Sequence, residues 1–324
     1  MSQYNRVGIA KGDTDTYDVI VLGGGPAGLT AGIYASRARL STLLVEKNYP
    51  GGQLMMCESI ENYPGFAQTS SGYDLSNAMR EQAEKFGMKT RMAEIDHIDL
   101  SGDIKVLHAT DGEQIRAKTV ILSLGAKPRK LGVPGEKEFL GRGVSYCAVC
   151  DGAFFKGKKL AVIGGGDTAV EDSVFLTRYA SEVSIIHRRD KFRAQRIIQE
   201  RALSHPVINV HWNSVVKGIG GVDAVDHLVL ENVITRQTVK VPVDGVFILI
   251  GLDPNTKMLD GQIKLDENGY IITDENMQTN IPGVFAAGDV RRKMLRQIVT
   301  ACADGAIAAT AAEKYIESRQ ENRK

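Results

Sequence analysis

Two cysteines separated by two residues carry the clearest chemistry in this chain of 324 residues. Cys147 and Cys150 are one helical turn apart, so both sulfurs can face the same side and close a small reactive ring. In such a pair one thiol can lower the pKa of the other and produce a thiolate that attacks a disulfide. Asp151 follows immediately and could move the proton that this exchange requires, although Asp-Gly is equally typical of a turn. The spacing therefore indicates a redox-active dithiol.

Half of a zinc site is the main alternative for this cysteine pair. A structural zinc site would need a second close pair of ligands. The remaining cysteines, Cys57 and Cys302, are isolated in the sequence, and the histidines do not cluster. We therefore expect no metal, and we interpret Cys57 and Cys302 as small buried residues.

A glycine-rich turn near the N-terminus predicts a dinucleotide site. The apolar run 17–22 indicates a buried parallel strand, and the alanine-rich stretch up to Ala35 indicates a helix. Glycines between them permit a tight turn, and the helix N-terminus offers N–H groups to a pyrophosphate. A second apolar strand, 42–45, ends at Glu46, where an acid can hold ribose hydroxyls. The glycines of this fingerprint are Gly23, Gly25 and Gly28.

A second glycine turn carries a basic cluster where the first carries an acid. The turn follows the apolar run 159–163, and its candidate cofactor contacts are Gly164, Gly166 and Thr168. The spacing that separates Gly23 from Glu46 leads here to His187, Arg188 and Arg189, with Arg193 a helical turn further on. Guanidinium groups bind a 2′-phosphate through charge-assisted hydrogen bonds, whereas a carboxylate would repel it. A solvated surface turn is the alternative, but the position of the cluster favours NADPH over NADH.

The C-terminal part adds a third signature. A short apolar strand, 283–287, ends in Gly288-Asp289, and Arg296-Gln297 precede an alanine-rich stretch, 301–312, that indicates a helix. Two further motifs are Gly51-Gly52-Gln53-Leu54 and Glu61-Asn62-Tyr63-Pro64-Gly65. Together with the cysteine pair and both glycine turns, they make the chain resemble the bacterial-type low-molecular-weight thioredoxin reductases. These are flavoproteins with two dinucleotide-binding domains, and the resemblance runs from about Tyr17 to the end of the chain.

The resemblance implies an electron path through FAD. It assigns FAD to the first site and places near it Gly52, Gln53, Asn62, Asp289, Arg296 and Gln297. It implies that hydride passes from NADPH to FAD, that Cys150 faces the flavin, and that Cys147 attacks the disulfide of thioredoxin, with Asp151 as acid or base. It also implies a homodimer in which one domain of each subunit rotates against the other. The chain departs from the usual family pattern at Cys57, Leu295 and Cys302-Ala303.

A repeated pattern predicts an α/β fold of two Rossmann-like dinucleotide-binding domains, with the NADPH domain inserted within the FAD domain. Each glycine turn opens a unit that closes with an apolar strand, 119–125 in the first and 246–251 in the second. We expect the FAD domain at 17–125 and 254–324, the NADPH domain with the cysteine pair at 126–253, and a polar N-terminal extension at 1–16.

Composition argues against several functional classes. The chain has 40 lysines and arginines against 39 acidic residues, so its bulk charge indicates neither nucleic-acid nor membrane binding. No apolar run approaches the roughly 20 residues of a membrane span. The N-terminal segment lacks the apolar region of a signal peptide. We therefore expect a cytoplasmic protein.

Other functions remain open at this point. The nearest is an NADPH-dependent flavoprotein that reduces a dithiol carrier other than thioredoxin. A ferredoxin–NADP reductase on the same scaffold would not need the cysteine pair. A non-catalytic NADPH or redox sensor, whose dithiol switches a partner, would show no sustained consumption of NADPH.

Overall fold

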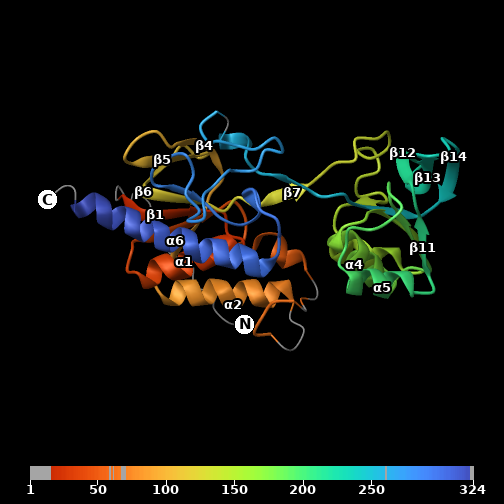
Figure 1. The fold of residues 1–324 in the computed structure, drawn as a ribbon, viewed down its shortest axis with the longest axis horizontal. Coiled ribbons are helices and arrows are strands. Elements are labelled where there is room, and N and C mark those ends of the chain that lie inside the picture. Colours follow the sequence, from red (N-terminus) through yellow and green to blue (C-terminus); the bar gives the residue numbers. More distant parts are fainter. Residues whose placement is uncertain (1–15, 58–59, 61, 67–70, 260, 322–324) are drawn as a thin grey trace. The chain divides into compact units, whose positions relative to one another are not determined.

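The chain folds into two units, each with its own sheet (Figure 1). The computed structural model describes residues 16–57, 60, 62–66, 71–259 and 261–321, without the side chains of Met56 and Cys150. Nearly all of the expected N-terminal extension, 1–16, lies outside the described residues. The first unit contains the chain before Lys127 and after Asp253, and the second unit, Lys127–Asp253, is inserted into it.

The first unit is built on a mixed sheet. Its strands are β1 (Tyr17–Leu22), β2 (Thr42–Glu46), β3 (Lys89–Met92), β4 (Ile95–Asp99), β5 (Lys105–Ala109), β6 (Gln114–Leu122) and β17 (Val284–Ala286). They follow the order β3-β2-β1-β6-β5-β4, with β17 beside β6. β1 pairs in parallel with β2 and β6, whereas β5 is antiparallel to β4 and β6. The first half of β6 pairs with β5 and the second half with β17, so the returning C-terminal chain completes the parallel part.

Three helices cover one face of this sheet, as Figure 1 shows. They are α1 (Pro26–Arg37), α2 (Gly72–Lys85) and α6 (Ile298–Glu321). Side chains of β1 alternate between the two faces: Val19 and Val21 pack with the helices, whereas Ile20 and Leu22 face a second core on the opposite side. Short 3₁₀ turns complete the unit at η1 (Gly52–Met56), η3 (Lys257–Leu259) and η4 (Gly288–Val290).

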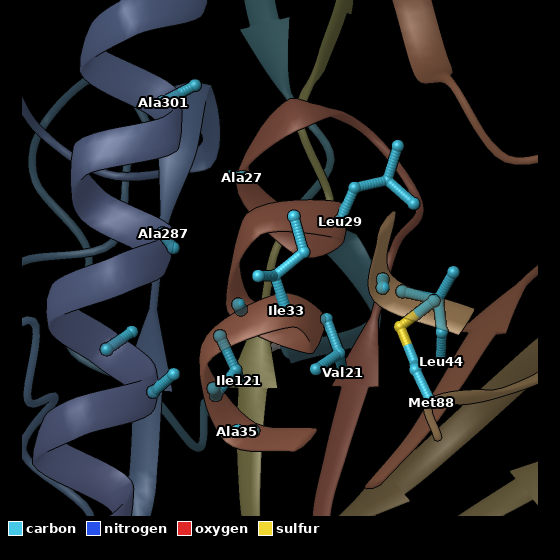
Figure 2. Packing of buried hydrophobic residues seen from close by; sticks show 14 of the residues in the cluster. Val21, Ala27, Leu29, Ile33, Ala35, Leu44, Met88, Ile121, Ala287 and Ala301 are labelled. Carbon is cyan, nitrogen blue, oxygen red and sulfur yellow. The ribbon is translucent and has the colours of Figure 1, made fainter. Parts of the chain in front are cut away.

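Small residues allow α1 and α6 to approach closely. Figure 2 shows Ala27 of α1 and Ala301 of α6 in the buried cluster where the two helices face each other. Gly305 of α6 lies so close to α1 that an added Cβ would overlap the carbonyl oxygen of Ala27. The alanine- and glycine-rich composition of both helices is therefore a packing requirement, because larger side chains would separate their backbones.

The second unit repeats the parallel strand–helix arrangement. Its parallel strands, in the order β11-β10-β9-β15-β8, are β11 (Ile208–His211), β10 (Glu182–Ile186), β9 (Lys159–Gly164), β15 (Gly245–Leu249) and β8 (Val144–Ser145). One face packs against an antiparallel sheet of β12 (Ser214–Gly221), β13 (Val225–Asn232) and β14 (Thr238–Pro242). The other face carries α3 (Ala148–Asp151), η2 (Gly152–Phe155), α4 (Asp167–Leu176) and α5 (Arg196–Leu203).

Two short strands connect the units. β7 (Ala126–Pro128) leads out of the first unit, β16 (Leu252–Pro254) leads back, and the two pair with each other. Just beyond this pair, the backbone N–H of Arg129 donates to Gly251 O at 2.9 Å and its Nε donates to Asp253 Oδ1 at 3.0 Å. Within the described residues, no helix is long and apolar enough to span a membrane.

The close approach of α1 and α6 predicts that Gly305→Ala destabilises the protein. Alanine favours a helix over glycine by about 1 kcal/mol, but overpacking a tight contact costs about 1–3 kcal/mol. We expect a net loss in the free energy of unfolding, measured by urea denaturation. Thr310→Ala, on the exposed side of the same helix, is the matched control and should be nearly neutral. Stabilisation by Gly305→Ala would contradict the packing argument.

Candidate functional site

The first glycine turn leaves the N-terminus of α1 open. Gly23 has φ of +105°, and an added Cβ there would overlap the carbonyl oxygen of Ser123. A Cβ on Gly28 would overlap Gly23 O, so both positions require glycine. Gly25 is the N-cap of α1, no side chain caps the helix, and an added Cβ at Gly25 would meet nothing within 4 Å. The uncapped N–H groups and the positive end of the helix dipole form an open site that suits the charge of a phosphate.

Glu46 lies beside this turn, at the end of β2. Its Oε2 accepts a hydrogen bond from the backbone N–H of Gly24 at 2.7 Å, and its Oε1 accepts one from Asn48 N at 3.2 Å. The acid and the glycine turn are separated by α1 in the sequence, and the fold brings them into contact. A carboxylate held at this position can accept from ribose hydroxyls.

Among the other residues expected near the flavin, Gly52 lies against the same turn, and Gln53, Asn62 and Gln297 have hydrogen-bond partners. In η1, Gly52 has φ of +59°, and its added Cβ would come within 3.1 Å of Gly25 Cα. Gln53 Nε2 donates to Ala126 O at 2.5 Å. Asn62 Nδ2 donates to Gln297 Oε1 at 3.0 Å, which joins two expected contacts from distant parts of the chain.

Asp289 and Arg296 each contain a buried polar atom without a partner in the described structure. Neither Asp289 Oδ1 nor Arg296 Nε has one, although the Arg296 guanidinium lies 4.0 Å from the ring centroid of Tyr270. Burial raises the pKa of Asp289 above its ordinary value, while Lys293 and Arg296 oppose the shift. Buried polar groups normally have partners. A polar ligand at this position would supply them, so Asp289 fits the ribityl–phosphate part of FAD and Arg296 fits the polar edge of the flavin ring.

Asp304 of α6 is a site residue that the sequence analysis missed. It is 6% exposed, and its carboxylate accepts from Gly288 N at 3.0 Å, Arg291 Nη1 at 3.1 Å and Lys293 Nζ at 2.6 Å. All three donors belong to the segment after β17, so Asp304 holds the loop that presents Asp289. The available signal was an acid in an otherwise small and apolar stretch, 301–312.

The second glycine turn repeats this geometry in the other unit. A Cβ on Gly164 would overlap Leu249 O, and Gly166 is the N-cap of α4 without a side-chain cap. An added Cβ at Gly166 would meet nothing within 4 Å, so this helix N-terminus is also open. Thr168 is exposed in the first turn of α4. The turn is thus free to accept a second pyrophosphate.

The basic cluster divides into one buried residue and three exposed ones. His187 is 5% exposed, its Nε2 lies 3.0 Å from Lys191 O, and its ring packs against Phe192 and Trp212. Burial lowers the pKa of His187, and Arg193 and Arg189 add to the effect, so the ring is neutral at pH 7. The exposed members of the cluster are Arg188, Arg189 and Arg193.

The segment with these arginines is fixed to the glycine turn. The backbone N–H of Arg193 donates to Gly165 O at 2.7 Å. A Cβ on Gly165 would overlap the His187 ring, so the histidine lies directly beneath the turn. In the part of the chain that the structure describes, no carboxylate pairs with the exposed arginines, which leaves them available to an anion. The expected role of His187 at the phosphate stays a prediction, because its side chain is buried.

Cys147 directly precedes α3 and is disulfide-bonded, whereas Cys57 and Cys302 form no disulfide. The side chain of Cys150 lies outside the description. The backbone N–H of Cys147 donates to Ser145 Oγ at 3.0 Å, and its carbonyl accepts from Asp151 N at 3.2 Å. This short helix packs through Ala148 against α4. No cluster of three or more metal-ligating side chains occurs among the described residues.

The interpretation of Cys57 as buried is wrong. Cys57 is exposed at the C-cap of η1. Cys302 is half-buried between α1 and Tyr63, with its Sγ 3.7 Å from Tyr63 Oη and 3.9 Å from Pro26 O. Burial, and then the neighbouring thiol, raise the pKa of Tyr63 to about 12. The two cysteines at which the chain departs from the usual family pattern thus differ in exposure: Cys57 is exposed and Cys302 is half-buried.

Two dinucleotide-type turns and a disulfide define a redox protein, and comparison with known proteins gives the family. The chain matches the family model described as pyridine nucleotide-disulphide oxidoreductase over residues 17–305, and it belongs to this family. It is 50% identical over 309 residues to the thioredoxin reductase of Bacillus subtilis (strain 168), covering 95% of this chain and 97% of that protein. It is 47% identical over 313 residues to the thioredoxin reductase of Peptoclostridium acidaminophilum, covering 95% and 99%.

A solved structure agrees in fold. The crystal structure of Lactococcus lactis thioredoxin reductase in its FR conformation is 46% identical, covers 94% of this chain and 100% of that one, and superposes with a TM-score of 0.91. The expected α/β fold with two Rossmann-like dinucleotide-binding domains is confirmed. FAD and NADPH are the cofactors that this family uses, and the open helix N-termini and unpartnered buried groups described above fit them.

Burial of Asp289 predicts a pH-dependent effect of Asp289→Asn on the flavin-free protein. A carboxyl whose pKa is raised on folding contributes stability below its unfolded pKa, near 3.8, and this stability is lost as the pH rises through the raised value. The free energy of unfolding of the variant, relative to that of wild type, should therefore be higher at pH 7 than at pH 4. Urea unfolding at the two pH values measures this difference. Asp96→Asn, at an exposed position, is the control. The same difference at both pH values would contradict burial of the charge.

Proposed function

We propose that this chain is a thioredoxin-disulfide reductase, which passes electrons from NADPH through FAD and the Cys147–Cys150 pair to oxidised thioredoxin. The observation that carries the proposal is the disulfide-bonded Cys147 at the start of α3, in a chain with two open glycine-turn helix N-termini. Relatives of 47–50% identity over 95% of the chain bear the same name. An NADPH-dependent reductase of another dithiol carrier is the second candidate, since the same site would serve it.

The residues of the first unit are proposed to bind FAD. The helix N-terminus at Gly25 would hold the pyrophosphate, Glu46 the ribose, and Asp289 the ribityl or phosphate region. The flavin ring would lie against the remaining expected contacts, Gly52, Gln53, Asn62, Arg296 and Gln297. The glycines Gly23 and Gly28 would act through the backbone, by making the turn possible.

The residues of the second unit are proposed to bind NADPH. The helix N-terminus at Gly166 and the hydroxyl of Thr168 would hold the pyrophosphate, with Gly164 shaping the turn. Arg188, Arg189 and Arg193 would hold the 2′-phosphate, because guanidinium groups match its charge and geometry. The buried ring of His187 would support the turn from below.

The dithiol chemistry belongs to the cysteine pair. FAD, when bound, would take hydride from NADPH and deliver two electrons to the disulfide. The thiolate of Cys147 then attacks the disulfide of thioredoxin, forms a mixed disulfide and releases one thioredoxin sulfur as a thiolate. Cys150 attacks the Cys147 sulfur, which re-forms the pair's disulfide and frees reduced thioredoxin. Asp151 would supply the proton to the leaving sulfur. The assignment to a homodimer and to the cytoplasm stays a prediction.

The electron path predicts that Cys150→Ser abolishes thioredoxin turnover. The purified FAD-loaded protein should oxidise NADPH steadily only when oxidised thioredoxin from the same organism is present. Cys150→Ser removes the sulfur that closes the cycle, so its rate should fall to background. The matched control is Cys57→Ser, at an exposed cysteine that forms no disulfide, which should keep the wild-type rate.

The alternatives give different results in the same assay. A reductase of another carrier would reduce its flavin with NADPH but would not turn over thioredoxin. A sensor would show no sustained NADPH consumption with any acceptor. A ferredoxin-type enzyme would keep its activity after loss of both Cys147 and Cys150, and near-normal thioredoxin turnover by Cys150→Ser would disprove the proposed path.

The exposed arginines predict a selective loss of NADPH affinity in Arg188→Ala/Arg189→Ala. A hydrogen bond to a charged group contributes about 1.5–3 kcal/mol, and 1.4 kcal/mol corresponds to about tenfold in affinity. The KM for NADPH should therefore rise at least about tenfold, while the KM for NADH stays nearly constant. Steady-state kinetics with both nucleotides measures this, with Arg236→Ala, an exposed arginine on a hairpin of the same unit, as the control. Equal effects on both nucleotides would show that the arginines do not contact a 2′-phosphate.

A further inference from the structure

A buried carboxylate lies close to the cysteine segment and is not used by the chemistry above. Glu136, in the loop between β7 and β8, is 5% exposed. Its Oε1 accepts from Tyr146 Oη at 2.6 Å and from Leu131 N at 2.7 Å, and its Oε2 accepts from Gly132 N at 2.5 Å. Among the described residues, no lysine or arginine pairs with it. Glu136 is thus a buried anion held by hydrogen bonds alone.

Burial and hydrogen bonding keep Glu136 ionised and Tyr146 protonated. Burial alone would raise the pKa of Glu136, but the hydrogen bonds from Tyr146 and from the loop backbone hold it below its ordinary value. Burial, and then the Glu136 carboxylate, raise the pKa of Tyr146, so the phenol keeps its proton. The contact is therefore a charge-assisted O–H···O⁻ hydrogen bond, stronger than a neutral one. Burying a charged acceptor is costly unless it is hydrogen-bonded, so the carboxylate of Glu136 depends on these donors.

The hydrogen bond between Glu136 and Tyr146 connects the segment after β7 with the segment that carries Cys147. Leu131 and Gly132 follow β7, one of the two strands that join the units. Tyr146 directly precedes Cys147, and its ring packs against the core between the parallel sheet and the β12–β14 sheet. One carboxylate therefore links the segment that leaves the connecting strand to the residue next to the reactive cysteine.

Cys147 is bonded directly to Tyr146, and hydrogen bonds hold its backbone. Ser145 Oγ, on the last residue of β8, accepts from the N–H of Cys147 at 3.0 Å and donates to its carbonyl at 3.2 Å. The same carbonyl accepts from Asp151 N and begins α3. Because Ser145, Tyr146 and Cys147 form one hydrogen-bonded segment, a displacement of Tyr146 would be transmitted to the backbone of Cys147.

We propose that the hydrogen bond between Glu136 and Tyr146 positions Cys147 for disulfide exchange. This inference rests on the proposed function of the cysteine pair. Glu136 and Tyr146 are positioning residues: they act through the backbone of Cys147 and have no part in the reduction of the flavin by NADPH. Exchange requires the attacking sulfur to align with the disulfide, so a small displacement slows this step selectively.

The test compares Tyr146→Phe with wild type in three assays on the FAD-loaded enzyme. The first is thioredoxin reduction, which uses the cysteine pair. The second is NADPH-dependent reduction of ferricyanide, which takes electrons directly from the flavin. The third is the rate at which iodoacetamide alkylates Cys147 in the reduced enzyme, read by mass spectrometry. Tyr179→Phe is the matched control. It removes a tyrosine hydroxyl from the same unit, and among the described residues this hydroxyl has no hydrogen-bond partner.

The expected result is a split between these assays. In Tyr146→Phe, kcat with thioredoxin should fall about tenfold and alkylation of Cys147 should rise by a similar factor, because a charge-assisted hydrogen bond no longer restrains the segment. Ferricyanide reduction and the KM for NADPH should stay unchanged. Glu136→Gln should change the same assays in the same direction, since an amide is a weaker acceptor and brings N–H groups toward the loop donors.

Other outcomes would overturn the inference. If Tyr146→Phe matched Tyr179→Phe in thioredoxin turnover and alkylation, the hydrogen bond would not position Cys147. An equal fall in thioredoxin and ferricyanide activity would indicate a general loss of structure. If the wild-type enzyme reduced ferricyanide but not thioredoxin, the proposed function would fail, while the alkylation rates of the two variants would still decide the positioning role.

Discussion

A helix N-terminus can hold a phosphate only if no part of its own chain covers it, and both glycine turns of the structure meet this constraint. At Gly25 and Gly166 the caps of α1 and α4 lack side chains, and the space in front of them is open. The open space exists because the preceding glycines fold the chain back tightly, with Gly23 against Ser123. A side chain at these positions would either break the turn or fill the cradle.

The open turn in the first unit depends on packing far away in the sequence. α6 must lie close to α1, which requires small residues where the two helices touch, as at Gly305. The same helix carries Asp304, whose carboxylate holds Gly288, Arg291 and Lys293. A buried carboxylate without these donors would be costly, and the loop would lose its shape without the carboxylate. The close packing of α6 thus fixes Asp289 beside the turn, with an oxygen left for a ligand.

Local sequence patterns predicted the elements around both turns well, since strand and helix periodicity is a property of neighbouring residues. The strand expected at 17–22 is β1, Tyr17–Leu22, and the one expected at 42–45 is β2, Thr42–Glu46. The last helix, expected at 301–312, is longer, because charged residues that favour helices continue it to Glu321.

Residues that act through distant partners could not be predicted in this way. Glu136 is one loop carboxylate among many in the sequence, and its burial depends on how Tyr146 and two backbone N–H groups meet it in space. Asp304 likewise acquires its role only when α6 docks. Cys57 was expected to be buried from its residue type alone, whereas the end of η1 leaves it exposed. Hydrogen bonding and exposure at such positions depend on tertiary structure.

The two turns also explain how one architecture distinguishes two ligands. Glu46 and His187 occupy equivalent positions at the ends of β2 and just beyond β10, and each lies against the middle glycine of its turn. Glu46 accepts a hydrogen bond from that glycine and keeps an oxygen near the site, whereas the neutral His187 ring fills the space beneath. With a neutral ring inside, the charge at the second site comes from the exposed Arg188 and Arg189. On the proposed assignment, the acid would favour a ribose with free hydroxyls, and the arginines would favour one that carries a phosphate.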